Sequence, residues 1–137
     1  MQKKELAGPG LRVLCVHPDD KVSGFLIRLL NEAGHRADRA ENGEEGWTKL
    51  AQNLNYFEVV VTAHRMPKLD GLGLVERLRN AHYPGRLVVL GETLSSKATG
   101  ACRRLAVDVV LSKRARADKL LRALTVFHTA RWAAPSG

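Results

Sequence analysis

Short apolar runs alternate with longer amphipathic stretches along most of the chain. The run at 11–16 stops before a proline, and the run at 57–62 is β-branched and almost continuous, which is typical of a strand buried on both faces. Between such runs, apolar residues recur at the three- and four-residue spacing of helices. The pattern predicts strands at 11–16, 36–40, 57–62, 87–90 and 107–111, and helices at 21–33, 43–54, 70–80, 95–105 and 117–130.

Each predicted strand is followed by a predicted helix. Repeated βα units with right-handed crossovers form an open parallel sheet that is covered by helices on both faces. In such sheets, ligands bind at the carboxyl ends of the strands. The residues in which function should be sought are therefore 17–20, 63–66, 91–93 and 112–114.

The composition fits one folded domain. With 137 residues, 45% hydrophobic and 26% charged, the chain can bury a substantial core but leaves little room for a multidomain enzyme. Its apolar runs are far shorter than the ~20 residues that span a bilayer, and residues 1–10 lack the apolar core of a signal peptide. Cys15 and Cys102 lie in apolar stretches and are expected to be buried, reduced thiols. We therefore expect a cytoplasmic location and no membrane contact.

Positive charge is concentrated in the last third of the chain. Residues 1–94 hold 13 basic and 12 acidic residues, whereas residues 95–137 hold nine basic and two acidic ones and account for +7 of the formal net charge of +8. A basic surplus is informative about binding partners rather than about fold.

Several short segments occur in the order and spacing of one known family. They are Asn42-Gly43-Glu44-Glu45, Met66-Pro67-Lys68-Leu69-Asp70-Gly71, Lys113 after the fifth strand, and the stretch from His17 to Gly34. On these residues, the chain from 13 to 127 resembles a response-regulator receiver domain, the flavodoxin-like module that accepts a phosphoryl group on an aspartate in two-component signalling. The resemblance implies an α/β fold of five βα units, with a five-stranded parallel sheet in the order 2-1-3-4-5.

The resemblance also suggests how the chain is divided. We expect a flexible N-terminal segment at 1–10, a receiver-like domain at 11–130 and a C-terminal tail at 131–137. Trp132 lies in that tail, which either docks on the domain or begins a linker.

The residues that would carry the family's phosphoryl chemistry are replaced. The acidic pair that holds Mg²⁺ in the family corresponds to His17 and Pro18, and the phosphoacceptor aspartate, four residues before the proline of the Met-Pro pair, corresponds to Ala63. Mg²⁺ requires oxygen ligands, and a methyl group cannot be phosphorylated. We therefore expect that the Mg²⁺ site is lost, that no cofactor is bound, and that the chain is a degenerate receiver, or pseudo-receiver.

The residues that would relay the signal are also replaced. The hydroxyl residue after the fourth strand corresponds to Gly91, and the aromatic switch of the fifth strand corresponds to Val110. Lys113 is retained, but Arg114 stands where the family has a proline joined by a cis bond. A non-proline cis bond costs about 3 kcal/mol, so this loop is expected to be trans.

The strand ends also carry aspartates and histidines that could support other chemistry. Asp19 and Asp20 could replace the missing acids if the first loop were shifted, but a helix cap and a solvated or lysine-paired carboxylate is the favoured interpretation. Lys113 is expected to pair with one of these aspartates or to turn into solvent. His17 and His64 could join an aspartate in a zinc site, yet histidines without short paired spacing are usually structural. We therefore expect no metal, and because no catalytic triad or phosphate-binding glycine loop is found, we expect no enzymatic activity.

The basic residues of the last third lie on the predicted helix–strand–helix surface 95–130, which the resemblance implies for dimerisation and partner docking. They include Lys97, Arg103, Arg104, Arg114, Arg116, Lys119 and Arg122. We expect this surface to bind an acidic protein partner of a signalling pathway, or a second copy of the chain. The alternatives are side chains that simply cover helix faces in solvent and, third, a surface for nucleic acid or another polyanion.

Overall fold

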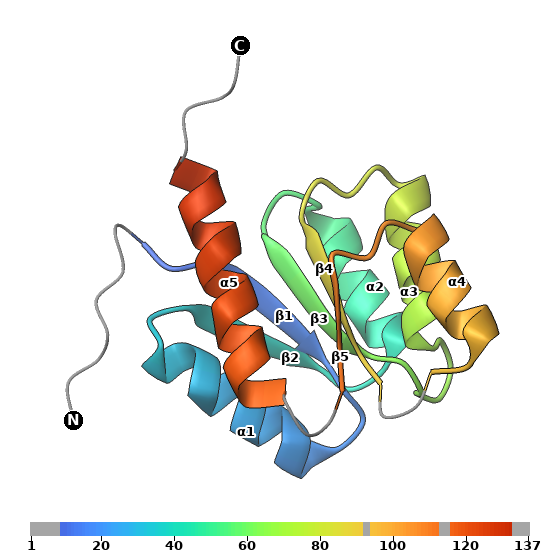
Figure 1. Cartoon of the computed structure of the whole chain (residues 1–137), viewed down its shortest axis with the longest axis horizontal. Helices are drawn as coiled ribbons and strands as arrows, with labels where there is room; N and C mark the ends of the chain where they lie inside the picture. The colour runs from blue at the N-terminus through green and yellow to red at the C-terminus, as the bar shows by residue number, and fades with distance from the viewer. Residues whose placement is uncertain (1–8, 92–93, 113–115, 133–137) are drawn as a thin grey trace.

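Five parallel strands form one sheet in the order β2-β1-β3-β4-β5, as Figure 1 shows. This is a computed structural model that describes residues 9–91, 94–112 and 116–132, the last of these without the side chains of 116, 131 and 132. The strands are β1 (Arg12–Val16), β2 (Arg36–Ala40), β3 (Val59–Ala63), β4 (Arg86–Leu90) and β5 (Val109–Leu111). The predicted flavodoxin-like fold and strand order are confirmed.

Helices cover both faces of the sheet. α1 (Asp20–Glu32) and α5 (Arg116–Trp132) lie on one face, and α2 (Gly43–Gln52), α3 (Gly71–Asn80) and α4 (Ser96–Arg104) lie on the other (Figure 1). α5 ends two residues beyond the predicted range, so the backbone of Trp132 is helical and not part of an extended tail. Among the described helices, none is both long and apolar enough to cross a membrane.

β3 is the central strand of the sheet and is rich in β-branched residues. Its five residues are all buried, because helices cover both of its faces. Val59 and Val61 pack in the cluster under α1 and α5, and Val60 packs in the cluster under α2 and α3. Successive side chains of a strand point to opposite faces, so a central parallel strand is largely apolar, and the one polar residue of β3, Thr62, donates its hydroxyl to the carbonyl of Ala63.

Three predicted strands begin later than expected, β1 by one residue and β3 and β5 by two. β3 begins at Val59 rather than at Phe57, although Phe57 is buried and its carbonyl accepts a hydrogen bond from the Tyr83 hydroxyl at 2.6 Å. β5 begins at Val109 rather than at Val107, because the backbone N–H of Val107 donates to the carbonyl of Cys102 and closes the end of α4. Backbone hydrogen bonds, rather than side-chain burial, set these two boundaries.

The end of the N-terminal segment contacts the domain. The carbonyl oxygen of Pro9 lies 2.9 Å from Nε2 of His128 on α5. Gly10 packs on the carbonyl of Gly34 so closely that a Cβ atom would overlap it. Residues 9 and 10 therefore belong with the packed domain, whereas the rest of the segment that was expected to be flexible lies outside the described residues.

Candidate functional site at the carboxyl ends of the strands

The loop after β1 is closed by its own polar groups. Nδ1 of His17 accepts a hydrogen bond from the backbone N–H of Asp19 at 3.0 Å. The Asp19 carboxylate in turn accepts the N–H groups of Lys21 at 2.8 Å and Val22 at 3.2 Å, and so forms the N-cap of α1. These hydrogen bonds, first from Val22 and then from Lys21, lower the pKa of Asp19. The interpretation of Asp19 as a helix cap is confirmed.

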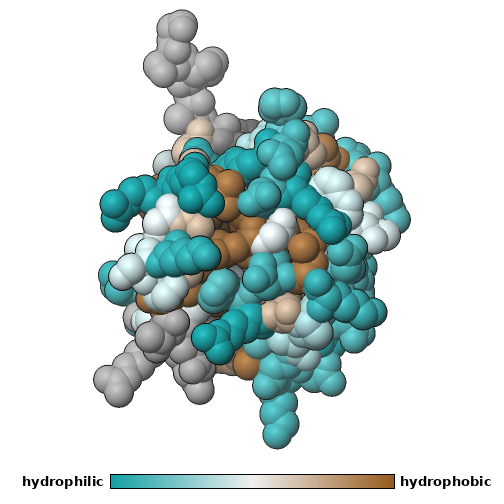
Figure 2. All heavy atoms as spheres, turned by 90° about the vertical axis from the view of Figure 1, so that its right-hand side faces the viewer, coloured by the Kyte–Doolittle hydropathy of each residue, from teal (hydrophilic) through white to brown (hydrophobic). Residues whose placement is uncertain are grey.

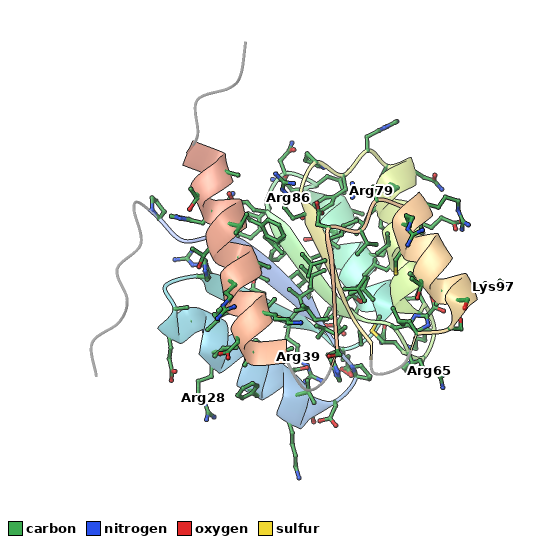
Figure 3. The ribbon with its side chains drawn as sticks, in the orientation of Figure 1. Arg28, Arg39, Arg65, Arg79, Arg86 and Lys97 are labelled. Atoms are coloured by element: carbon green, nitrogen blue, oxygen red, sulfur yellow. The ribbon has the colours of Figure 1, made fainter. Side chains whose placement is uncertain are left out.

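Asp20 is held by an arginine that the sequence did not single out. Its carboxylate lies 2.6 Å from Nη1 of Arg39, which comes from β2 and whose Nη2 also donates to the carbonyl of His17 at 3.4 Å. Figure 3 shows Arg39 near the beginning of α1. The strand order 2-1-3-4-5 was the signal for this contact, since it places the end of β2 beside the end of β1. Lys113, which was expected to pair with Asp19 or Asp20, lies outside the described residues, as does its bond to Arg114.

Ala63 is the last residue of β3, and only 6% of it is exposed. Its carbonyl accepts a hydrogen bond from the Thr62 hydroxyl at 3.0 Å. Gly71 at the start of α3 packs against the same carbonyl, and a side chain at Gly71 would overlap it. Asp70 accepts the N–H of Gly73 at 2.7 Å and caps α3. The Asp-Gly pair therefore shapes this loop through its backbone.

The strand register brings three of the predicted positions to one edge. Val16 is paired with Thr62 and Ala63 with Leu90, so His17, Ala63 and Gly91 follow one another across the ends of β1, β3 and β4. Pro18, beside His17, is exposed. Together these positions offer an imidazole, a pyrrolidine ring, a methyl group and a bare backbone, and no carboxylate.

Val110 and His64 lie at the margins of this edge. Val110, on β5, is 43% exposed. Nδ1 of His64 is buried and makes no hydrogen bond within the described residues. In that part of the chain no group of three His, Cys, Asp or Glu side chains could hold a metal ion.

Comparison with known proteins identifies the family. Residues 13–125 match the sequence model of the response regulator receiver domain. The chain belongs to this receiver domain family. Receiver domains are regulatory modules that act with protein partners in signalling pathways.

Receiver domain relatives occur in bacteria and plants. The chain is 32% identical over 102 residues to the gliding motility regulatory protein of Myxococcus xanthus, which covers 74% of this chain and 13% of that protein. It is 33% identical over 70 residues to the two-component response regulator-like PRR37 of Oryza sativa subsp. indica, which covers 51% of this chain and 9% of that protein. The chain therefore spans only a small part of these relatives.

Solved receiver structures share the fold. The receiver domain of the Francisella response regulator 1452 superposes with a TM-score of 0.80 at 24% identity, covering 89% of this chain and 99% of that one. CheY4 of Vibrio cholerae superposes with a TM-score of 0.77 at 20% identity, covering 86% and 98%. At these identities the likeness concerns the fold alone.

The receiver's basic surface lies on α4, β5 and α5. Its described side chains are exposed: Lys97, Arg103, Arg104, Lys119 and Arg122. Arg114 lies outside the described residues, and only the backbone of Arg116 is described. None of these five side chains takes part in an ion pair with another described residue. Val110 and Val126, 43% and 64% exposed, add apolar groups to β5 and α5. Figure 2, seen from the side of α4, shows hydrophobic atoms surrounded by hydrophilic ones.

Proposed function

We propose that this receiver domain is not phosphorylated at the position that its family uses, and that it acts by binding a protein partner independently of phosphorylation. The observation that carries the proposal is Ala63, whose methyl group stands at the end of β3 where an acceptor would need an oxygen nucleophile. In phosphoryl transfer, catalysis depends on positioning and charge neutralisation, so without a nucleophile the reaction has no centre.

The neighbouring residues do not fit the Mg²⁺ ion that the family uses. Mg²⁺ takes oxygen ligands in octahedral geometry, but positions 17 and 18 hold an imidazole and a proline ring. The nearest carboxylates are engaged elsewhere, since Asp19 caps α1 and Asp20 is paired with Arg39. Gly91 and Val110 provide neither a hydroxyl nor an aromatic ring to respond to a phosphoryl group.

The basic surface of α4, β5 and α5 is the proposed docking site. Cations without ion-pair partners among the described residues attract an acidic partner over a distance of about 10 Å at moderate salt, which speeds encounter. Val110, exposed on β5, supplies an apolar contact within that basic surface. Two copies of the same basic surface repel each other, so a different, acidic chain is favoured over a homodimer.

Incubation with acetyl phosphate and Mg²⁺ tests the proposal. We expect the intact mass of the chain to stay unchanged, with no labile phosphoryl group in acid or base. The variants Ala63→Asp and Ala63→Asn are the matched pair, since only the first restores an acceptor. A phosphoryl group on the unaltered chain would overturn the proposal.

Nuclear magnetic resonance titrations test the docking surface. A glutamate-rich peptide should shift the amide signals of α4, β5 and α5 in the whole chain, and Arg103→Glu with Arg104→Glu should weaken that binding. Arg28→Glu is the control, because Arg28 is an exposed arginine on α1 (Figure 3). Tighter binding of a DNA duplex than of the peptide, at equal salt, would instead favour a polyanion-binding domain.

A further inference from the structure

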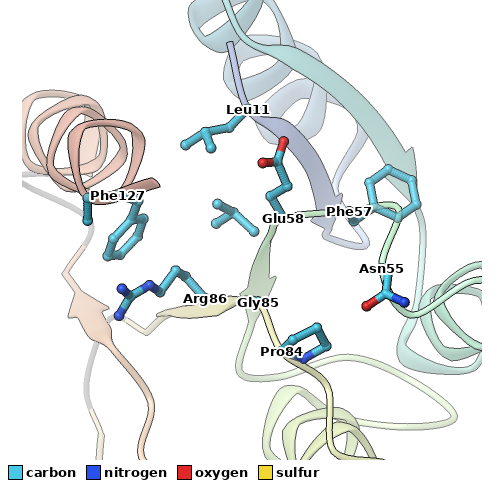
Figure 4. Close-up of a pocket in the computed structure, with 10 residues that line it drawn as sticks. Leu11, Asn55, Phe57, Glu58, Pro84, Gly85, Arg86 and Phe127 are labelled. Atoms are coloured by element: carbon cyan, nitrogen blue, oxygen red, sulfur yellow. The ribbon is translucent and has the colours of Figure 1, made fainter. Parts of the chain in front are cut away.

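A cavity of about 240 Å³ lies at the amino-terminal edge of the sheet, opposite to Ala63. Figure 4 shows it between the starts of β1, β3 and β4 and the last turns of α5. Leu11, Val59 and Phe127 form an apolar wall, and Glu58 and Arg86 are the charged residues that line it. Apolar, concave sites with a few polar groups are the usual form of small-molecule sites.

The frame of the cavity is rigid. Leu11 and Val59 are 2% and 0% exposed, so their side chains are fixed in the core. Gly85 lies between the Tyr83 ring and the carbonyl of Glu58, where a side chain would overlap both. The Tyr83 hydroxyl, bonded to the Phe57 carbonyl, holds this corner in place. A pre-formed site of this kind loses little conformational entropy when a ligand binds.

Asp108 and Phe127 orient the Arg86 side chain, but some of its hydrogen-bond donors are not used within the described residues. Its Nη1 lies 3.3 Å from Oδ1 of Asp108, and the other carboxylate oxygen of Asp108 accepts the N–H of Leu87 at 2.8 Å. The guanidinium lies over the ring of Phe127, 5.4 Å from its centre. A guanidinium carries five N–H donors, and within the described residues Arg86 donates only to Asp108 through its side chain. Donors therefore remain for a further carboxylate.

Glu58, the carboxylate that lines the cavity, forms an ion pair with Arg12. Its carboxylate accepts the backbone N–H of Arg12 at 3.1 Å and forms an ion pair with the Arg12 guanidinium at 3.8 Å. Figure 4 shows the Glu58 carboxylate pointing toward Leu11, whereas the Arg86 guanidinium lies beside Phe127. Because Arg12 compensates its charge, Glu58 can form part of the wall without excluding an anion.

We propose that this cavity binds a small carboxylate that carries an apolar ring. The carboxylate accepts hydrogen bonds from Arg86, and the ring packs against Phe127, the partly exposed member of the apolar wall. A cavity of about 150 Å³ is large enough for benzene, so the volume here admits a ligand of one or two rings. Charge-assisted hydrogen bonds to arginine select a carboxylate over a neutral amide of the same shape.

Benzoate and benzamide are the probes for this proposal, titrated into the whole chain and followed by amide shifts. Benzoate should shift the signals of Arg86, Gly85 and Phe127 saturably, and benzamide should bind about tenfold more weakly or worse. Arg86→Gln should weaken benzoate binding by a similar factor, and Arg28→Gln, on the exposed face of α1, should leave it unchanged. Acetate, which lacks the ring, should bind more weakly than benzoate.

A second variant tests the cavity even if Arg86→Gln does not fold. Ala130 is an exposed residue of α5 that lines the cavity, so Ala130→Trp should block benzoate without touching the ion pair of Arg86. Equal binding of benzoate and benzamide, unchanged binding in both variants, or benzoate shifts confined to α4, β5 and α5 would each overturn the proposal. The cavity lies at the end of the sheet opposite to Ala63, so neither this test nor the acetyl phosphate test decides the other.

Discussion

Restoring three carboxylates at the strand ends should create a metal-dependent domain. In the variant His17→Asp, Pro18→Asp, Ala63→Asp, the new residues stand at the ends of neighbouring strands, because Val16 of β1 is paired with Thr62 of β3. An aspartate at position 17 can still accept the N–H of Asp19 that His17 accepts now. The change therefore adds negative charge while keeping the hydrogen bond that shapes the loop.

The magnitude follows from the spacing of the strands. Neighbouring strands lie about 4.8 Å apart, so carboxylates at positions 17 and 63 stand roughly 5 Å from each other. At an effective dielectric constant of 20 they repel by about 3 kcal/mol. Without metal, the variant should melt about 10 °C below the unaltered chain. Mg²⁺ at a hundred times its dissociation constant should return about 2.7 kcal/mol.

Thermal unfolding in EDTA and in Mg²⁺ measures both effects. The unaltered chain should melt at the same temperature in either buffer. The matched variant with asparagine at all three positions has similar side-chain volume without the charge, so it should lose less stability than the aspartate variant and should show no rescue by Mg²⁺. Stabilisation of the unaltered chain by Mg²⁺, or a triple aspartate variant that Mg²⁺ does not stabilise, would refute the reasoning. Even when metal binds, switching should not return, because Gly91 and Val110 still lack the relay groups.

Four further predictions concern the core and the backbone. Tyr83→Phe removes the hydroxyl that donates to the carbonyl of Phe57. Urea titrations should show a free energy of unfolding lower by about 1–3 kcal/mol. An unchanged value would mean that water replaces this hydrogen bond. Gly71→Ala should lower the free energy of unfolding by about 1–3 kcal/mol, because the new methyl group would overlap the carbonyl of Ala63. Gly100→Ala has open space around it and should stabilise α4 by about 0.5–1 kcal/mol. Equal effects of the two substitutions would contradict the packing argument. Burial raises the pKa of Cys15 from 9.0 to about 12, so at about pH 8 its thiolate is about a thousandfold scarcer than that of an ordinary thiol and iodoacetamide should label it only on unfolding. The raised pKa means that the folded protein holds the Cys15 proton more tightly than the unfolded chain does. The contribution of Cys15 to the free energy of unfolding is therefore complete below pH 9.0 and is lost as the pH rises toward about 12. Urea titrations at alkaline pH should detect this loss.

The order of the elements could be predicted because a strand that is buried on both faces of a parallel sheet has a recognisable local sequence, a short run of apolar residues. Every residue of β3 is buried, and its run of valines signals this without any knowledge of the neighbouring strands. The cap at Asp19 could be predicted for the same reason, since the hydrogen-bond donors lie two and three residues away. Such interactions depend on neighbours in the chain and not on how distant segments meet.

Contacts between distant segments could not be predicted with the same sharpness. The Asp20–Arg39 ion pair joins α1 to the end of β2, and Arg39 reads in the sequence as an ordinary polar residue of an edge strand. The cavity at the amino-terminal edge depends on Leu11, which precedes β1, on Arg86 of β4 and on Phe127 of α5. No periodicity marks such residues, because their distances are set by how the helices pack on the sheet.

The loop between β3 and α3 bears on how receiver domains are recognised from sequence. Asp70 caps α3, and Gly71 is required because the carbonyl of Ala63 occupies the space of a side chain. Both residues thus stabilise the backbone of the turn, and their roles do not depend on which side chain is present at position 63. A chain of this family can therefore keep the Asp-Gly turn and carry an alanine at the end of β3, as this one does. Proteome surveys that count receivers by this stretch therefore measure how widespread the scaffold is, whereas the chemistry depends on the residues at the strand ends.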